Sequence, residues 1–381
     1  MIESKYQNGE ARGLKKDRTT ANKAFKFRLY PNSGQRVLLA KTFGCCRFIY
    51  NQMLSDKAAC YEGTGTMLKP TPAWYKAKFE WLREVDSLAL ANEQLHLEAA
   101  YRNFFRDKSV GFPKFKSKHR GKNSYTTNLV NGNIALTDGF LKLPKLGRVK
   151  VKQHRQIPDG YRLKSVTVSL TPTGKYFAAI LYEYDVEITP VKPVNLIGLD
   201  FSMGGLFVDS NGGSADYPRY YRQSQEKLAR EQRKLSRRKK DGKNRQKQKL
   251  KVAKLHEKIA NQRSDFLHKR SRLIANAYDA VCIEDLDMKA LSQASRFGKS
   301  VSDNGWGMFR NMLAYKLADR GKRLIVIDKW FPSSKRCSNC GAVRETLSLA
   351  ERVFRCECGF VCDRDTNAAV NIKTEGARLI A

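Results

Sequence analysis

The segment LIGLD, residues 196–200, decides the fold of the C-terminal half of the chain. Its apolar residues end in an acid, and the glycine pair at 204–205 follows shortly after, a pattern typical of a buried strand that leads into a turn. A carboxylate at the end of a buried strand loses hydration, which costs free energy. We therefore expect Asp200 to have a chemical function at this position. The segment therefore predicts a sheet edge that carries an acidic functional group.

Two further acids stand in comparable contexts. Glu284 ends the apolar run AVCIE, residues 280–284, and Asp365 begins a predicted helix in DRDTNAAVNI, residues 363–372. Three ionised carboxylates at one edge of a sheet would repel one another unless divalent cations lay between them. Oxygen ligands select Mg²⁺ or Mn²⁺, and a pair of such ions is the arrangement that hydrolyses phosphodiesters.

Each acid also has a simpler interpretation. Asp200 could be a turn residue, Glu284 could be a surface acid, and Asp365 could cap its helix, a common role of Asp. Neighbouring acids could then take the catalytic role: Asp285 or Asp287 in place of Glu284, and Asp363 in place of Asp365.

A cysteine-rich segment precedes the last helix. Cys337 and Cys340, followed by a glycine, have the spacing of a zinc knuckle, and Cys356 and Cys358 supply a second pair. Four thiolates fit a closed, tetrahedral structural zinc site. The second pair is C-x-C rather than C-x-x-C, so Cys362 is an alternative ligand, although we favour Cys356 and Cys358. The tight pairs and the odd number of cysteines indicate a reducing compartment and a bound metal rather than disulfides.

The net charge points to a polyanionic partner. The chain of 381 residues carries 72 Lys and Arg against 37 Asp and Glu, a formal charge of +35. Residues 221–272 are the most basic segment and predict two helices with a break at 240–243. We expect nucleic-acid backbone contacts from these side chains: Arg237, Arg238, Lys239, Lys240, Lys114 and Lys116. The chain has no long apolar segment that would span a membrane, and residues 1–22 are predicted to be a flexible extension without the features of a secretory signal.

The N-terminal half combines a helical insertion with short strands. KAFKFRLY, residues 23–30, alternates apolar and basic side chains and predicts a strand with one buried face. A helix with a buried face through Leu39, Phe43 and Tyr50 follows. A second helical region is predicted at 74–108, with an apolar stripe made of Leu88, Ala91, Leu95, Ala99 and the segment Tyr101 to Phe105. From Gly111, short strands between turn signals predict a small antiparallel barrel to which the first strand returns.

The order of the motifs resembles one known family. They are FRLYPN, NFF and GFPKFKSK, then IGLDFSMGGL, RSDFLHK, VCIEDLDMKAL, SDNGWGMF, FPSSKRCSNCG and CDRDTNAAVNI, which together span about residues 23–372. This order resembles TnpB, the RNA-guided DNA endonuclease family of bacterial insertion sequences, related to compact type V CRISPR effectors. The match of the motifs places the family's catalytic acids on Asp200, Glu284 and Asp365.

The resemblance implies an α+β multidomain protein. Its parts would be a wedge β-barrel (23–32 and 111–190), an inserted helical recognition domain (33–110), an RNase H-like (RuvC) nuclease domain (191–328 and 362–381) and a zinc-ribbon module (329–361). It also implies a guide RNA from the transposon end, a double-stranded DNA target beside a short motif, and Mg²⁺ or Mn²⁺ at the nuclease site. Recognition of such a motif in the major groove needs polar side chains, and the candidates are Asn92, Gln94 and His96 of the helical region. We expect a monomer in complex with RNA, located in the cytoplasm and associated with the bacterial nucleoid. Two alternatives are a nuclease-silent RNA-guided repressor, which the intact acids disfavour, and an RNase H-type transposase, which the lack of a recognisable helix-turn-helix disfavours.

Overall fold

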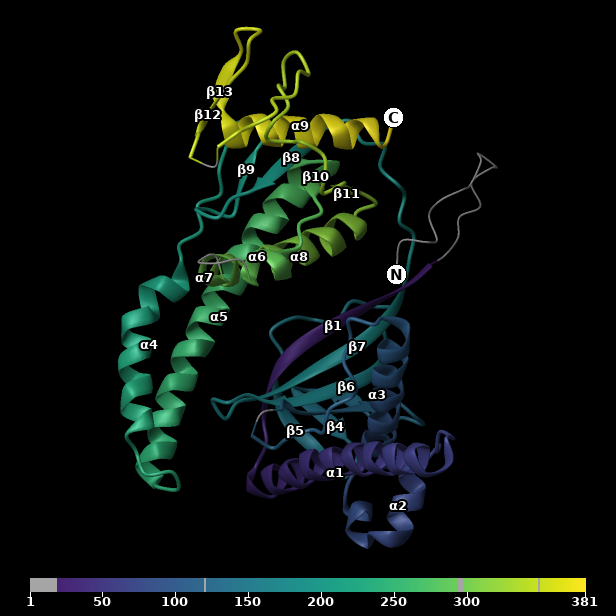
Figure 1. Ribbon diagram of the computed structural model, residues 1–381. Helices are drawn as coiled ribbons and strands as arrows, with labels where there is room; N and C mark the ends of the chain where they lie inside the picture. Colours follow the sequence, from purple (N-terminus) through teal and green to yellow (C-terminus); the bar gives the residue numbers. More distant parts are fainter. Residues whose placement is uncertain (1–18, 120, 294–297, 349) are drawn as a thin grey trace. The chain divides into compact units, whose positions relative to one another are not determined.

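The computed structural model describes residues 19–381 apart from residues 120, 294–297 and 349 (Figure 1). The chain divides into two compact units, Met1–Glu187 and Ile188–Ala381. None of the described helices is long and apolar enough to cross a membrane. The first unit contains β1 (Thr19–Tyr30), α1 (Ser33–Thr64), α2 (Pro72–Lys78), the 3-10 helix η2 (Glu80–Glu84), α3 (Ser87–Arg106), β2 (Asn123–Asn128), β3 (Ala135–Thr137), β4 (Phe140–Leu143), β5 (Gly147–Lys152), β6 (Arg162–Leu170) and β7 (Tyr176–Val186).

The first strand joins the later strands, as the sequence predicts. The described strands of this unit form a seven-stranded antiparallel sheet in the order β2-β6-β7-β1-β5-β4-β3, so β1 lies between β7 and β5. Phe25, Phe27 and Leu29 of β1 are buried, which confirms the alternation in KAFKFRLY. No pairing between β2 and β3 is found among the described residues, so closure of this sheet into a barrel stays a prediction.

Strand β1 is longer than the sequence indicates. It begins at Thr19, inside the segment expected to be a flexible extension, because Thr19–Asn22 pair with the end of β7. Cross-strand hydrogen bonds of β7, which runs to Val186, supply the partners that the local sequence does not show. Residues 1–18 lie outside the described residues.

Among the described residues, three α-helices and the 3-10 helix η2 are inserted between β1 and β2. Helix α1 begins with a capping box, in which Asn32 and Gln35 satisfy each other's backbone N–H groups. Its buried face contains Leu39, Phe43 and Tyr50, as predicted. The stripe predicted for α3 is wrong for most of its members, because Leu88 is only half-buried and Ala91, Leu95 and Ala99 are exposed. Tyr101 is the member of that stripe that is buried. The buried residues of α3 are instead Ala89, Leu90, Asn92, Glu93, Leu97 and Tyr101.

The second unit is a mixed sheet with helices on both faces. Its described sheet has the order β11-β10-β8-β9, in which β10 is parallel to β11 and β8 and only β9 is antiparallel. The elements are β8 (Leu196–Phe201), β9 (Phe207–Asp209), α4 (Tyr220–Ser236), α5 (Lys243–Ala277), β10 (Ala280–Glu284), α6 (Met288–Gln293), α7 (Gly298–Asn304), α8 (Trp306–Ala318), β11 (Arg323–Ile327), β12 (Val353–Arg355), β13 (Val361–Asp363) and α9 (Arg364–Arg378).

The two faces of this sheet carry separate cores. Helices α5 and α8 cover one face, where Leu199 and Ile283 pack with Trp306 and Phe309. Helix α9 covers the other face, where Cys282 packs with Ile372 (Figure 1). Trp306 is among the largest fully buried side chains in the described part of the chain and lies in the first of these cores.

The basic segment forms a helical hairpin, as its break predicts. Helices α4 and α5 lie side by side (Figure 1), joined by residues 237–242. Arg245 of α5 donates to the carbonyls of Leu235 and Arg238, and Gln248 donates to the carbonyl and carboxylate of Glu231. These bonds satisfy carbonyls near the C-terminus of α4 and fix the alignment of the two helices.

Asp303, in α7, binds the start of α4 rather than the helix α8 that follows it. The N-cap position of α8 is Gly305, without a side-chain bond. The buried Asp303 carboxylate accepts instead from the backbone N–H groups of Tyr221 and Arg222, at the start of α4. A negative charge at a helix N-terminus is favourable, so Asp303 stabilises the start of the hairpin.

Gly198 provides a stability test of this fold. A Cβ at Gly198 would overlap the Ala369 carbonyl oxygen and lie 2.7 Å from the backbone nitrogen of Lys373 in α9. We expect Gly198→Ala to destabilise the unit by about 2 kcal/mol or more, because helix backbone cannot yield as a flexible side chain can. Gly307→Ala is the matched control, since a Cβ there meets nothing within 4 Å and alanine favours the helix by about 1 kcal/mol. Urea unfolding of the two variants measures both effects, and equal stabilities would contradict this packing.

Candidate active site and metal centre

The three predicted acids come from elements that meet at one edge of the sheet. Asp200 is near the end of β8 and Glu284 ends the adjacent parallel strand β10. Asp365 lies in the first turn of α9, the helix that packs against β8 at Gly198. Strand residues alternate between faces, so Asp200 shares with Gly198 the face that α9 covers. This topology brings the three acids together.

The charges of these acids interact. Burial raises the pKa of Asp200 well above its usual range, and the negative charges of Glu284 and Asp365 raise it further. The Arg364 guanidinium acts in the opposite direction on Asp200. Burial also raises the pKa of Glu284, while a hydrogen bond from Ser333 lowers it. The cluster therefore holds more negative charge than its protein surroundings balance.

Two neighbours contact the acids directly. The Ser333 hydroxyl donates to Oε1 of Glu284. Arg364 donates from Nε and Nη2 to Oδ1 of Asp365, at 3.2 and 3.1 Å. The sequence analysis missed both residues, although both stand inside its motifs, Ser333 in FPSSKRCSNCG and Arg364 in CDRDTNAAVNI.

The neighbouring acids have structural contacts of their own. Asp363 is the N-cap of α9 and accepts from the Thr366 backbone N–H at 2.9 Å. Asp285 is exposed and pairs with Arg310 at 3.0 Å. Asp287 accepts from the backbone of the turn that starts α6, which lowers its pKa. These contacts leave Asp200, Glu284 and Asp365 as the better candidates.

Cys337, Cys340, Cys356 and Cys358 gather at a second candidate site. Their sulfurs all lie within 4.8 Å of one another, and in the described part of the chain no other group of possible ligands is this tight. The Sγ atoms of Cys337 and Cys358 are 3.8 Å apart, and those of Cys340 and Cys356 are 3.6 Å apart. Zinc–sulfur bonds of about 2.3 Å in a tetrahedron place sulfurs about 3.8 Å apart, so the four thiols fit zinc.

A glycine with positive φ follows each of the two cysteine pairs. Gly341 and Gly359 have φ values of +82° and +86°, which L side chains rarely adopt. The backbone N–H of Phe360 lowers the pKa of Cys358, which favours the thiolate form that binds metal. Cys362 lies in β13 and outside the cluster, so the cluster contains the favoured C-x-C pair, and its ligation of zinc stays a prediction.

The cysteine module is attached to the acidic cluster through α9. Asn367 and Asn371 of α9 both donate to the Arg336 carbonyl, and Asn371 also donates to the carbonyl of Ser333. All of these groups are in the segment before the first knuckle or in α9. The same helix therefore carries Asp365 and holds Ser333, the partner of Glu284.

The predicted RNA contacts differ in their surroundings. Arg237, Arg238, Lys239 and Lys240 are exposed at the tip of the α4–α5 hairpin. In the first unit, Lys114 is exposed, whereas Lys116 is partly buried. The Lys116 ammonium donates to the buried carboxylate of Glu93 and lies 4.2 Å from the centre of the Tyr50 ring. Lys116 thus has a structural role, and its contact with nucleic acid stays a prediction.

The three candidates for DNA recognition are not equivalent. Asn92 is buried and its amide donates to the Leu88 carbonyl of its own helix, which corrects the expectation that this side chain faces DNA. Gln94 bonds to Glu98 at 2.9 Å, and the half-exposed His96 lies 3.5 Å from Glu93. Gln94 and His96 remain the accessible members of the set.

Family models match three parts of the chain. The model described as "Probable transposase" matches residues 179–295, and that described as "Cas12f1-like, TNB domain" matches residues 306–372. A model described as "Helix-turn-helix domain" matches residues 21–66, where the structure has strand β1 and the single continuous helix α1. The last description therefore does not fit the local structure of this chain.

Whole-chain relatives and a solved structure extend this result. A protein of Streptomyces pristinaespiralis, named "Putative RNA-guided DNA endonuclease", is 35% identical over 93% of this chain and 89% of its own. The RNA-guided DNA endonuclease InsQ of Escherichia coli K12, also named as putative, is 33% identical over 94% and 93%. The structure of a Cas12f1–sgRNA–target DNA complex is similar in fold, with a TM-score of 0.57 at 14% identity over 93% of this chain and 99% of that one. Because two relatives exceed 30% identity over nearly their whole length, this chain belongs to the TnpB (OrfB) family of IS605-type insertion sequences.

Proposed function

We propose that this protein is a guide-RNA-dependent, divalent-metal-dependent endonuclease that cuts double-stranded DNA beside a short transposon-associated motif. The observation that carries the proposal is the meeting of Asp200, Glu284 and Asp365 at one sheet edge, in a chain of this family. The four-stranded sheet with helices on both faces suits an RNase H-like (RuvC) nuclease domain. The carboxylate oxygens are the donor set that Mg²⁺ or Mn²⁺ prefers, and their unbalanced negative charge favours cations.

The residues of the cluster would divide the work. Asp200, between the other two acids in this electrostatic network, would hold both cations, and Glu284 and Asp365 would complete their ligands. Two bound divalent cations would activate the attacking water and stabilise the leaving oxygen of the phosphodiester. Ser333 orients the Glu284 carboxylate, and Arg364 holds that of Asp365. The oxygen atoms of the three carboxylates lie farther apart than the sulfur atoms of the four cysteines. The carboxylates would therefore move closer together when they bind cations.

The positive charge of the chain would hold the guide RNA. An RNA–DNA heteroduplex is recognised through its backbone and its A-form shape, for which dispersed Lys and Arg are suited. The exposed hairpin tip, residues 237–240, has four cations and no acid. The half-exposed His96 and Gln94 of the first unit are the candidates that would recognise the DNA motif.

We assign structural zinc to the four cysteines, which leave no ligand position open for a substrate. The module between β11 and α9 buries few residues of its own, so metal would supply much of its folding free energy. Zinc would thereby fix the segment that contains Ser333, which contacts Glu284. The function of the zinc would be to support the nuclease site rather than to take part in the reaction.

Asp200→Asn tests the nuclease assignment. We expect cleavage of a guide-matched DNA to fall by at least about a thousand-fold, since a catalytic group is removed, while affinity for the guide RNA stays unchanged. Asp285→Asn is the control, because this acid is adjacent to Glu284 in sequence but exposed and paired with Arg310. Cleavage is measured under single-turnover conditions in Mg²⁺. Wild-type rates for Asp200→Asn would refute the assignment, and guided binding without cleavage by the wild type would favour the repressor.

Zinc content tests the cysteine assignment. Cys337→Ser should lose the bound zinc and lower the melting temperature, because the buried Cys337 thiol is a member of the cluster. Cys362→Ser should retain one zinc per chain, since Cys362 lies outside the cluster. Metal analysis of the purified proteins measures both. Zinc loss in Cys362→Ser alone would show that the ligand set is different.

The hairpin tip is tested through the salt dependence of RNA binding. Replacing Arg237, Arg238, Lys239 and Lys240 with Gln should weaken guide binding and reduce the slope of log affinity against log salt by about 3, as fewer counterions are released. The charge-conserving Arg237→Lys/Arg238→Lys variant should leave the slope unchanged. Filter binding between low and moderate salt gives both slopes. An unchanged slope after the four replacements would place the RNA elsewhere.

A further inference from the structure

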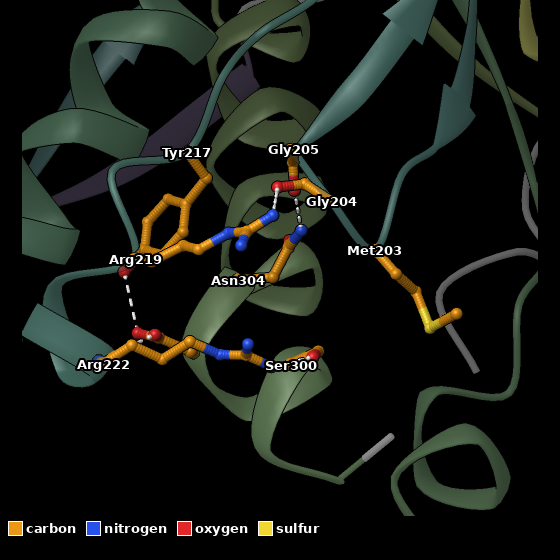
Figure 2. Close-up of a pocket in the computed structure, with 9 residues that line it drawn as sticks. Met203, Gly204, Gly205, Tyr217, Arg219, Arg222, Ser300 and Asn304 are labelled. Carbon is orange, nitrogen blue, oxygen red and sulfur yellow. Dashed lines mark hydrogen bonds between the residues drawn. The ribbon is translucent and has the colours of Figure 1, made fainter. Parts of the chain in front are cut away.

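A cavity of about 190 Å³ lies beside the turn that follows β8 (Figure 2). Met203, Gly204 and Gly205 form one wall, and the start of α4 and the end of α7 form the others. Two arginines, Arg219 and Arg222, extend along it in the close-up. No step of the reaction proposed above uses this cavity.

The cavity is at the same sheet edge as Asp200 but on the opposite face. Asp200 shares the face covered by α9, so the next residue, Phe201, points to the other face, where its ring is 5.5 Å from that of Trp306. The cavity is on the face of the sheet that α8 covers, because it is lined by Asn304, two residues before Trp306. A strand of nucleic acid that crosses the edge of the sheet could therefore contact both the carboxylates and the cavity.

Both arginines are held in place by neutral oxygens. Arg219 donates from Nη2 to the Gly204 carbonyl at 3.0 Å, and Arg222 donates from Nη2 to the Ser300 hydroxyl at 2.7 Å. Among the described residues, neither guanidinium has a carboxylate within ion-pair distance. Their charges are oriented but not neutralised, and each keeps further N–H donors for a ligand.

The one acid that lines the cavity is already balanced. Asp303 is buried and accepts from the Tyr217 hydroxyl and from two backbone N–H groups of α4. It also lies 3.6 Å from the Arg263 guanidinium. The carboxylate thus has its own partners and does not neutralise Arg219 and Arg222. The cavity keeps a net positive charge.

The remaining wall is rigid and polar. The buried Asn304 amide donates to the carbonyls of Ser202, at 2.9 Å, and Gly205, which fixes the turn after β8. Its Oδ1 atom has no partner among the described atoms. This buried acceptor takes no part in holding an anion, so the preference of the cavity for an anionic ligand comes from the charges of Arg219 and Arg222. The paired N–H donors of a guanidinium match the geometry of two oxygens of a phosphate.

We propose that Arg219 and Arg222 form a subsite for one phosphodiester of the single-stranded DNA that is led to the carboxylates. The inference rests on the proposed nuclease function and adds a residue pair that positions the substrate. A phosphate held on the far face of the sheet edge fixes the path of the strand, so that the scissile phosphate arrives at Asp200 in a defined register. The two arginines do not touch the reacting phosphate and are positioning residues.

The test combines arginine variants with modified DNA. In single-turnover cleavage of guide-matched DNA, Arg222→Gln and Arg219→Gln should each slow the reaction about ten-fold, the effect of one charge-assisted hydrogen bond. A scan of uncharged methylphosphonates through the strand near the cut should find one position that slows the wild type similarly. At that position the methylphosphonate should cause no further loss in Arg222→Gln, because the contact is already absent. Arg323→Gln, an exposed arginine at the amino end of β11, is the control and should show the full methylphosphonate effect.

Binding measurements separate this inference from the nuclease assignment. Fluorescence anisotropy measures the affinity of the guide-loaded complex for the same DNA strands in Ca²⁺ and needs no cleavage. At the sensitive position, the methylphosphonate and Arg222→Gln together should weaken binding no more than either does alone. Guide-RNA affinity and melting temperature should match the wild type in both arginine variants. The subsite is refuted if the methylphosphonate effects remain additive at every position, or if Arg222→Gln loses guide RNA instead. If the wild type does not cleave the DNA but its binding shows the non-additive effect, the nuclease assignment is refuted and the phosphate subsite is retained.

Discussion

The close approach of helix α9 to strand β8 is the constraint on which the second unit depends. At Gly198 the helix backbone occupies the space of a side chain, and at Gly376 the same helix meets Cys282 of β10. Only glycine allows such contacts without displacing one element. Because α9 lies this close, the acid in its first turn meets two acids from the strand ends. A helix displaced by one side chain would separate Asp365 from Asp200 and remove the cluster.

The cysteine module extends the same constraint. It is inserted between β11 and α9, so its folding determines how the chain enters that helix. Asn367 and Asn371 bind the segment before the first knuckle, and Ser333 in that segment contacts Glu284. A metal bound by thiolates at one end of α9 can therefore stabilise an oxygen-ligand site at the same end without touching it. The two candidate metal sites are mechanically coupled through one helix.

Charge is distributed in a way that fits a long polyanion. The α4–α5 hairpin presents its cations at an exposed tip, and its two helices are aligned by Arg245 and Gln248. Asp303 stabilises the start of this hairpin next to the cavity of Arg219 and Arg222. The region that we assign to RNA and the region that we assign to DNA thus share one structural element. A net charge of +35 would destabilise the compact protein without such partners.

The sequence by itself determined what depends on local pattern. The ends of the apolar strands at Asp200 and Glu284, the cysteine pairs, the alternation in β1 and the break in the basic segment are all visible in short windows. Only the tertiary structure decided what depends on contacts between distant residues. It made Asp363 the cap and left Asp365 in the cluster, and it excluded Cys362. It also buried Asn92 while leaving Ala91, Leu95 and Ala99 of the predicted α3 stripe exposed. It also revealed Ser333, Arg364 and the pair Arg219 and Arg222. A hydrogen bond depends on a partner that is often distant in the sequence, and a charge is unpaired only if no partner lies near it in space. No local sequence pattern encodes either property.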